Sequence, residues 1–157
     1  MSKFITDYKT LVEKAQTLCD GVPYQVSNLS NLAALLYETL EEINWAGFYI
    51  SRGDQLVLGP FQGRPACILI PYGRGVCGTA AQKDTAQLVP DVHKFPGHIA
   101  CDLASRSEIV IPIHENGKVW GVLDIDSAIP ERFDEADRAG LESFARFIEK
   151  NLGLWFE

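Results

Sequence analysis

The sequence predicts an α+β fold in which helices cover one mostly antiparallel sheet. Two amphipathic helical stretches open the chain, strands joined by tight turns follow, and a long helical stretch closes it. Strands joined by short turns pair in antiparallel fashion, so this order is typical of a single sheet with helices packed on it. The 157 residues suffice for one well-buried core, and we expect one domain over residues 1–157.

Two helices are expected before the first strand. The first spans residues 3–19, and the second begins at Ser27 or Ser30, either of which can act as its N-cap, and ends near Ile43. Both stretches have apolar residues at helical spacing, and an Asp-Gly-Val-Pro turn separates them. Cys19 lies at the edge of the first apolar stripe, where a cysteine usually acts as a small buried hydrophobic residue.

The strands are recognised by alternation, by aromatic and β-branched residues and by turn signals. They are expected at residues 45–50, 55–61, 66–70, 108–113 and 119–126. Ser51–Asp54 and Asn116-Gly117 are the turns of two hairpins. Residues 76–82 are compatible with a short helix, and this helix and the loop after it form an insertion that we expect to roof a pocket on one sheet face. A closing helix is expected from Asp134, a good N-cap, to about Phe156.

Composition and charge argue against a nucleic-acid-binding protein and against a membrane protein. A net charge of −7 with scattered Lys and Arg argues against a nucleic-acid partner, which needs a basic surface. The first ten residues contain no apolar signal segment, and no stretch approaches the roughly 20 apolar residues of a membrane span. We therefore expect a cytoplasmic protein without a membrane segment. Because thiols stay reduced in that compartment, the four cysteines are expected to be core residues, metal ligands or redox groups.

The segment Asp91–Glu108 is the part of the chain that folding requirements do not explain. It gathers two histidines, a cysteine and three carboxylates around a Phe-Pro-Gly turn, and it has neither a helical nor a strand period. Reactive groups concentrated in a loop indicate function, because a rigid scaffold positions its chemistry on loops. We assign no catalytic role to His93 or His98, since loop histidines usually bond only to the backbone.

Three of the cysteines, Cys67, Cys77 and Cys101, lie on a predicted strand, on the short helix and in this loop. A zinc site formed by them and His98 is one alternative, but the chain has no CxxC pair, and single ligands on separate elements are unlike a structural zinc site. Burial as an ordinary thiol suits Cys67 but not Cys77 or Cys101, which lie among glycines and polar residues. A thiol near a helix amino end or a histidine has a lowered pKa and a usable thiolate, which favours redox chemistry.

Carboxylates form a second candidate group. Asp124 and Asp126 are two positions apart in a predicted strand and therefore project from the same face. If the Asn-Gly hairpin is in simple register, Glu108 lies across from Ile125, between the two aspartates. Like charges this close raise the pKa of one carboxyl and keep a proton available near neutral pH.

Two aromatic residues, Trp45 and Tyr49, project from one face of the first predicted strand. Aromatic side chains at such positions usually belong to the core. They also form the walls of small-molecule sites, so the residues alone leave the two roles equally open.

Four segments resemble one known family. They are GRGVCGTAA at Gly73–Ala81, DVHKFPGHIACDLASRSEIV at Asp91–Val110, GVLDIDS at Gly121–Ser127 and RFDEAD at Arg132–Asp137. With the spacing of the three cysteines, they make the chain similar to the free methionine-(R)-sulfoxide reductases, which use a GAF-type domain. The resemblance covers essentially the whole chain. It implies a single GAF-type domain with a sheet of about six strands covered by helices on both faces.

The resemblance also implies a reaction and the residues that perform it. Free L-methionine (R)-sulfoxide is the expected substrate. Cys101 is expected to attack its sulfur and become a sulfenic acid, Cys67 to resolve that acid as an intramolecular disulfide, and Cys77 to relay or substitute. Thioredoxin is the expected reductant of the disulfide. The residues expected to bind the substrate are the pocket carboxylates and the aromatic wall, namely Glu108, Asp124, Asp126, Trp45 and Tyr49.

The expected chemistry requires neither a metal nor an organic cofactor, because thiols and carboxylates suffice for it. The rival class is a sensory GAF module that binds a small ligand or detects redox state, but a pure binding module has no need of three thiols. A zinc-stabilised interaction domain is the third alternative. The first helix is available for a homodimer contact, and the sequence leaves the oligomeric state open.

Overall fold

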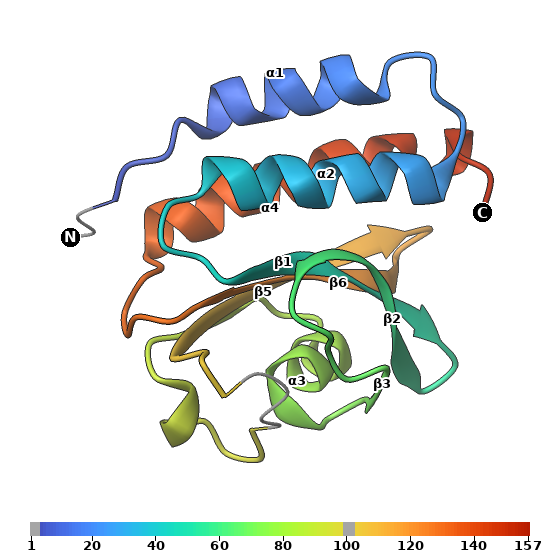
Figure 1. Cartoon of the computed structure of the whole chain (residues 1–157). Coiled ribbons are helices and arrows are strands. Elements are labelled where there is room, and N and C mark those ends of the chain that lie inside the picture. Colours follow the sequence, from blue (N-terminus) through green and yellow to red (C-terminus); the bar gives the residue numbers. More distant parts are fainter. Residues whose placement is uncertain (1–3, 99–102) are drawn as a thin grey trace.

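A computed structural model of the chain describes residues 4–98 and 103–157 (Figure 1). Its helices are α1 (Tyr8–Cys19), α2 (Gln25–Thr39), α3 (Gly75–Lys83), α4 (Glu135–Asn151) and the short 3₁₀ helices η1 (Val92–Lys94) and η2 (Leu152–Leu154). Its strands are β1 (Trp45–Arg52), β2 (Gln55–Gly63), β3 (Leu69–Pro71), β4 (Gln87–Val89), β5 (Ser107–Glu115) and β6 (Lys118–Ser127). Within this described part, no helix has both the length and the apolar composition that crossing a bilayer requires. The predicted α+β class is confirmed.

One six-stranded sheet organises the molecule, with the strand order β3-β2-β1-β6-β5-β4. Each neighbouring pair of strands in it is antiparallel. Helices α2 and α4 cover one face, and α1 packs on those two helices as an outer layer (Figure 1). Helix α3 lies on the opposite face, where the insertion is expected. The prediction of helices on both faces is therefore confirmed.

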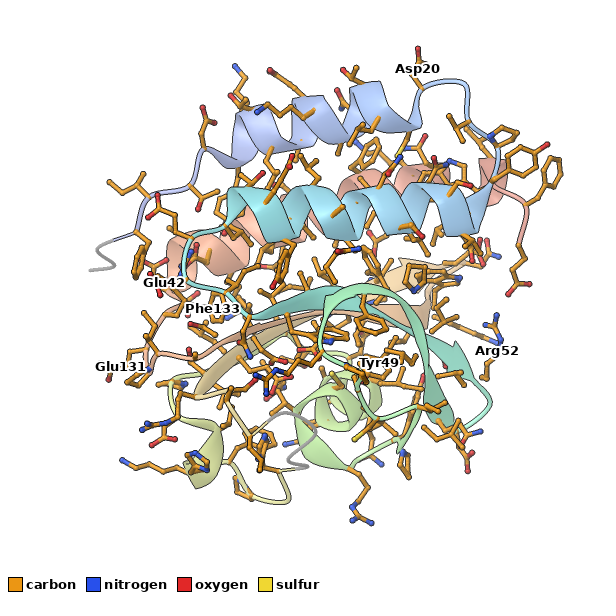
Figure 2. All side chains as sticks on the ribbon, viewed as in Figure 1. Asp20, Glu42, Tyr49, Arg52, Glu131 and Phe133 are labelled. Carbon is orange, nitrogen blue, oxygen red and sulfur yellow. The ribbon has the colours of Figure 1, made fainter. Side chains whose placement is uncertain are left out.

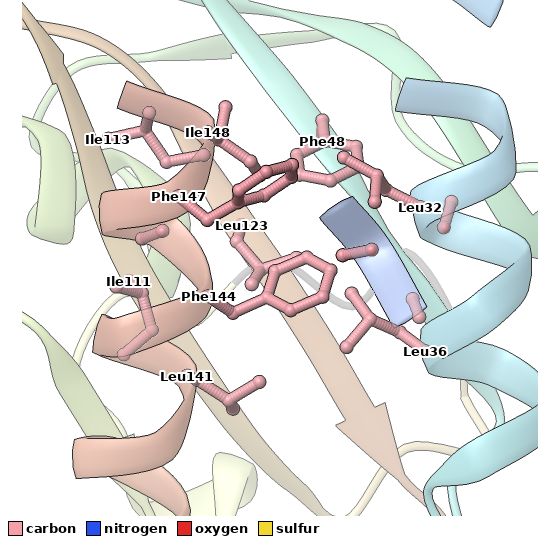
Figure 3. Packing of buried hydrophobic residues seen from close by; sticks show 14 of the residues in the cluster. Leu32, Leu36, Phe48, Ile111, Ile113, Leu123, Leu141, Phe144, Phe147 and Ile148 are labelled. Atoms are coloured by element: carbon pink, nitrogen blue, oxygen red, sulfur yellow. The ribbon is translucent and has the colours of Figure 1, made fainter. Parts of the chain in front are cut away.

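The larger hydrophobic core lies between the sheet and the layer of α2 and α4 (Figure 3). The alternation predicted for the strand after the loop is confirmed, since Ile109, Ile111 and Ile113 of β5 all belong to this core. Leu36 of α2 and Phe144 of α4 are completely buried in it. Each such side chain stabilises the fold by about 1.5–3 kcal/mol relative to its exposed state, so this face fixes the sheet. The opposite face of the sheet, which α3 covers, is therefore available for a functional site.

The predicted serine cap of α2 is wrong. The helix begins at Gln25, and the side chain of its N-cap residue, Tyr24, makes no capping hydrogen bond. Ser27 and Ser30 both lie inside the helix. The Gln25 backbone N–H instead donates to the carbonyl of Phe156 at 2.9 Å, near the opposite end of the chain. A long-range bond therefore determines where α2 starts, and the local pattern does not contain it.

Three further helix ends fall inside the predicted ranges: α1 begins at Tyr8 rather than residue 3, α2 ends at Thr39 rather than Ile43, and α4 ends at Asn151 rather than Phe156. The chain after α4 turns back, because the Phe156 N–H donates to the Pro23 carbonyl at 2.7 Å. The predicted N-cap of α4 is confirmed. Asp134 accepts a hydrogen bond from the Asp137 backbone, and the side chain of Asp137 accepts one from the Asp134 backbone in a capping box.

The third strand is shorter than predicted and leaves Cys67 outside it. Strand β3 contains only Leu69–Pro71, whereas residues 66–70 are expected from the sequence. The Cys67 carbonyl accepts a hydrogen bond from the Tyr49 hydroxyl at 2.9 Å, so it is held by a side chain of β1. The prediction also lacks β4, a three-residue edge strand beside β5 that is too short to show a period.

The register of the β5–β6 hairpin differs by one residue from the simple one. Its turn lies at Asn116-Gly117 as predicted, and both residues have positive φ. Trp120 is an extra residue in β6, so the pairing shifts by one position beyond it. Glu108 therefore pairs with Asp126 and not with Ile125. Because opposed residues project from the same face, the shift places Glu108 with the aspartates rather than in the core.

Gly140 lies where α4 packs against α1, and it leaves no space for a side chain. A Cβ atom there would lie 2.1 Å from the Tyr8 ring, which is held by its hydroxyl bond to Asp137 at 2.7 Å. Gly140→Ala is expected to lower the free energy of unfolding by about 2 kcal/mol, because an overpacking cost of ~3 kcal/mol outweighs the ~1 kcal/mol that alanine gains in a helix. Urea unfolding followed by circular dichroism measures this difference.

The matched control for this variant is Gly153→Ala. The Cβ position at Gly153 meets nothing within 4 Å, so this variant should stay within about 0.5 kcal/mol of the parent protein. Equal stability of the Gly140 and Gly153 variants would contradict the close contact between α1 and α4.

Candidate active site

A cavity lies between α3 and the sheet face opposite the main core. Six of the eight predicted site residues line it: Trp45, Tyr49, Cys77, Glu108, Asp124 and Asp126. Figure 2 shows Tyr49 on this side of the sheet. Cys67 is half-buried and follows the lining residue Ala66. Cys101 lies outside the described residues. The expectation that the insertion roofs a pocket is met by α3, which supplies Cys77 from above the sheet.

The carboxylates meet at the carboxyl-terminal half of β6. Glu108 of β5 pairs with Asp126, and Val110 pairs with Asp124, so all three carboxyl groups project toward α3. Glu108 is 7% exposed and Asp124 is 5% exposed. The Cys77 Sγ lies 3.9 Å from Glu108 Oε2, and ligand atoms of Cys77, Glu108 and Asp124 all lie within 4.8 Å of one another. One thiol and two carboxyl groups therefore share a site with little exposure to solvent.

Burial determines the protonation of this cluster. The pKa of Glu108 is raised well above its usual value, first by burial and then by the charges of Asp124 and Asp126. Burial also raises the pKa of Asp124, but hydrogen bonds with Glu108 and Cys77 act in the opposite direction. Glu108 is thus the carboxyl of this cluster whose protonated form is favoured most strongly. Among the described residues, Asp124 Oδ1 is a buried oxygen without a hydrogen-bond donor.

The cysteines differ in their state. Cys67 is disulfide-bonded, whereas Cys19 and Cys77 have free thiols. Cys19 is buried in the main core as expected, and burial raises its pKa to about 11. The lowered pKa expected for a thiol near a helix amino end is wrong for Cys77. Burial, followed by the charges of the neighbouring carboxylates, raises the pKa of Cys77 well above its usual value and keeps it a neutral thiol.

The two aromatic residues form one wall of the cavity. Trp45 stacks on Tyr49 with 5.9 Å between ring centroids and on Phe61 with 5.2 Å. Gly47 makes room for this stack, because a Cβ atom there would lie 2.3 Å from the Cβ of Phe61. The Trp45 Nε1–H donates to the Arg64 carbonyl at 3.1 Å, and the Tyr49 hydroxyl donates to the Cys67 carbonyl at 2.9 Å. The wall therefore also holds the segment that carries Cys67.

The cavity contains further residues to which the sequence gives no site role: Arg64, Arg74, His98 and Ser105. The two arginines are exposed and lie in turns beside glycine or proline, which carry only a loop signal. Burial, and then the neighbouring His93, lower the pKa of His98, so its imidazole is neutral at pH 7. Only the fold shows that these polar groups converge on the carboxylates.

Cys77, Glu108 and Asp124 are also grouped closely enough to hold a metal ion. The predicted zinc alternative uses a different set, and within residues 4–98 and 103–157 neither Cys67 nor His98 belongs to such a group. Metal ligands must be deprotonated, and the pKa values of all three groups are raised. The arrangement therefore suits proton transfer better than metal binding.

Comparison with known proteins places this geometry in a family. The sequence model of the GAF domain family matches residues 14–152 of this chain. The free methionine-R-sulfoxide reductase of Escherichia coli is 50% identical over 145 residues, which cover 92% of this chain and 88% of that protein. The solved structure of fRMsr of Staphylococcus aureus in its reduced form is 50% identical, with a TM-score of 0.91 and coverage of 94% of this chain and 96% of that one.

The structure of a third relative has been solved in complex with its substrate. The free methionine-R-sulfoxide reductase of Neisseria meningitidis, in complex with its substrate, is 40% identical, has a TM-score of 0.91 and covers 98% of this chain and 96% of its own. Identity at this level extends over nearly the whole of each relative, and the cavity lies inside the matched GAF region. The chain therefore belongs to the GAF-domain family, within the group of the free methionine-R-sulfoxide reductases.

Proposed function

We propose that the protein reduces the (R) diastereomer of free L-methionine sulfoxide to methionine. The observation that carries this proposal is the buried cluster in which Glu108, whose pKa is raised well above its usual value, lies beside Asp124, with the Cys77 thiol and an aromatic wall around them. A sulfoxide becomes reactive toward a thiolate only when its oxygen receives a proton, and Glu108 is a suitable donor. The named activity of the relatives in Escherichia coli and Neisseria meningitidis supports the same reaction.

The cavity fits a free amino acid. Asp124 Oδ1, which has no hydrogen-bond donor among residues 4–98 and 103–157, is a place for the substrate ammonium, since a buried carboxylate requires a charged or polar partner. Asp126 lines the same cavity and is the second candidate for that contact. Trp45 and Tyr49 offer an apolar wall for the methyl group beside the sulfur. A peptide-bound methionine has no such ammonium.

The proposed first step transfers oxygen from the substrate to a cysteine. The Cys101 thiolate attacks the sulfoxide sulfur while Glu108 protonates the oxygen, and the sulfur–oxygen bond then breaks as the oxygen passes to the cysteine. One thiol and one sulfoxide thereby become one sulfenic acid and one thioether, so the cysteine is oxidised by two electrons. Cys101 takes this role from the family motif that it shares.

The proposed second step forms a disulfide and releases water, as the Cys67 thiol attacks the sulfenic acid. The disulfide at Cys67 supports this assignment. Cys77 is a neutral thiol in the resting protein and is therefore assigned a relay or substitute role. Thioredoxin, a cytoplasmic dithiol protein, then reduces the disulfide by thiol–disulfide exchange and returns both cysteines to thiols.

The test is incubation of the protein with each diastereomer of free methionine sulfoxide and dithiothreitol, with release of methionine as the readout. The (R) form is expected to be the substrate. The N-acetyl derivative of the same diastereomer lacks only the charged amine and should react about 10²–10³-fold more slowly, because it leaves a buried carboxylate without its partner. Turnover of neither diastereomer would instead favour a ligand-binding GAF module, and equal rates with the N-acetyl derivative would contradict the role of Asp124.

A further inference from the structure

Two large apolar side chains follow the disulfide-bonded Cys67 and point into solvent. Ile68 is 65% exposed and Leu69 is 55% exposed. Single exposed apolar residues are common on protein surfaces. Two consecutive exposed apolar residues directly after a redox cysteine are a different case, because a protein that reduces the disulfide contacts the residues next to Cys67.

The backbone at this point is an open sheet edge. Strand β3 is the last strand of the sheet and pairs only with β2. The Leu58 N–H donates to the Ile68 carbonyl at 2.9 Å, and Ile70 pairs with Leu56, so these alternate residues direct their polar groups toward β2. In an antiparallel ladder the residue between them directs its N–H and C=O the other way. The polar groups of Leu69 therefore face the open edge, where an extended segment of another protein can pair with them.

We propose that Ile68, Leu69 and the open edge of β3 form the docking surface for a dithiol protein that reduces the disulfide at Cys67. The inference rests on the proposed function. The partner is a protein whose reactive thiol is surrounded by an apolar surface with a backbone segment free to pair. Such a partner covers both side chains and brings its thiolate against the sulfur of Cys67, a half-buried residue.

The step itself is a two-electron exchange. The partner's thiolate attacks the Cys67 sulfur, a mixed disulfide forms, and the other sulfur of the original disulfide leaves as a thiolate and takes up a proton. The second thiol of the partner then attacks the mixed disulfide and releases the Cys67 thiolate. The partner ends as a disulfide, and this protein regains two thiols. A small dithiol such as dithiothreitol performs the same exchange without docking. Comparing it with a protein reductant therefore distinguishes a defect in the disulfide exchange from a defect in partner binding.

The experiment compares two reductants on the double variant Ile68→Ser, Leu69→Ser. With thioredoxin, its reductase and NADPH, the KM for thioredoxin is expected to rise about 10–100-fold, as for the loss of two central apolar contacts. With dithiothreitol, turnover is expected to stay within about twofold, because neither residue lines the substrate cavity. The matched control is Leu154→Ser, an equally apolar residue that is 70% exposed in η2, and it should change neither reaction.

Three outcomes overturn the inference, and they are distinguishable. An unchanged KM for thioredoxin in the double variant shows that the partner docks elsewhere. Equal losses with thioredoxin and with dithiothreitol show that Ile68 and Leu69 support the active site rather than recognition. A parent protein that reduces no sulfoxide with dithiothreitol refutes the proposed reaction, and this inference with it.

Discussion

Replacing Cys101 by serine is expected to abolish methionine release completely, including the first stoichiometric turnover. A serine hydroxyl is far less nucleophilic toward sulfur than a thiolate and does not form the sulfenic acid. In the parent protein, pre-reduced and freed of reductant, one equivalent of sulfoxide should yield about one equivalent of methionine. Rapid mixing and quenching, with methionine measured by chromatography, gives both amplitudes.

The other cysteines provide the controls for this experiment. Cys67→Ser should still release about one equivalent of methionine and then stop as a sulfenic acid, which a dimedone label detects. Cys77→Ser should keep the same burst, because the raised pKa of Cys77 makes it a poor nucleophile. A burst that survives in Cys101→Ser but is lost in Cys77→Ser would show that the roles of these two thiols are exchanged.

Glu108→Gln is expected to slow sulfenic acid formation by about 10²–10⁴-fold, the usual contribution of a positioned general acid. Glutamine keeps the shape of the side chain but has no acidic proton to give. The folded-state pKa of Glu108 is raised, so the acid is present below that pKa and is lost as pH rises through it. The parent rate should therefore fall as pH rises through this raised pKa, and this fall should disappear in the variant.

Single-turnover rates from pH 5 to pH 9 measure this effect. The reaction of the Cys101 thiol with iodoacetamide should be unchanged in Glu108→Gln, because alkylation needs no proton donor. Asp126→Asn is the matched carboxylate variant, and it should mainly raise the substrate Kd if Asp126 holds the ammonium. A variant of Asp126 that removes the pH dependence, while Glu108→Gln keeps it, would assign the donor to Asp126.

Elements with a strong local signal could be predicted from the sequence. The aromatic β1, the alternating isoleucines of β5, the Asn-Gly turn and the Asp134 cap each depend on residues a few positions apart. The start of α2 could not be predicted, because it is set by a backbone bond to Phe156 from the far end of the chain. The sequence pattern places Cys67 in a strand. In the structure its carbonyl is instead bonded to the Tyr49 hydroxyl of β1, and the local pattern does not contain this contact.

The candidate site was predictable as a set of residues but not as a chemical state. The carboxylates and the aromatic residues are visible in the sequence as unusual side chains on one strand face. The pKa of Cys77 could not be predicted from the sequence. Its position at a helix amino end suggests a lowered pKa, whereas complete burial beside two carboxylates raises it. His98 and Arg64 lie in loops, and only the folded chain brings them to the same cavity.

The extra residue Trp120 has a consequence for how the length of this hairpin can change. Loops and turns usually accept insertions and deletions. Here the parity of the residue count between Glu108 and Asp126 decides which side chains of β5 face α3. Adding or removing one residue within the paired strands, unless a second bulge compensates, would shift the register by one position, so that Ile109 rather than Glu108 shares a face with Asp126. The placement of the Glu108 carboxyl in the cavity therefore depends on the number of residues that pair between Glu108 and Asp126, as well as on the identity of residue 108. Only a change of that number by an even amount preserves the placement.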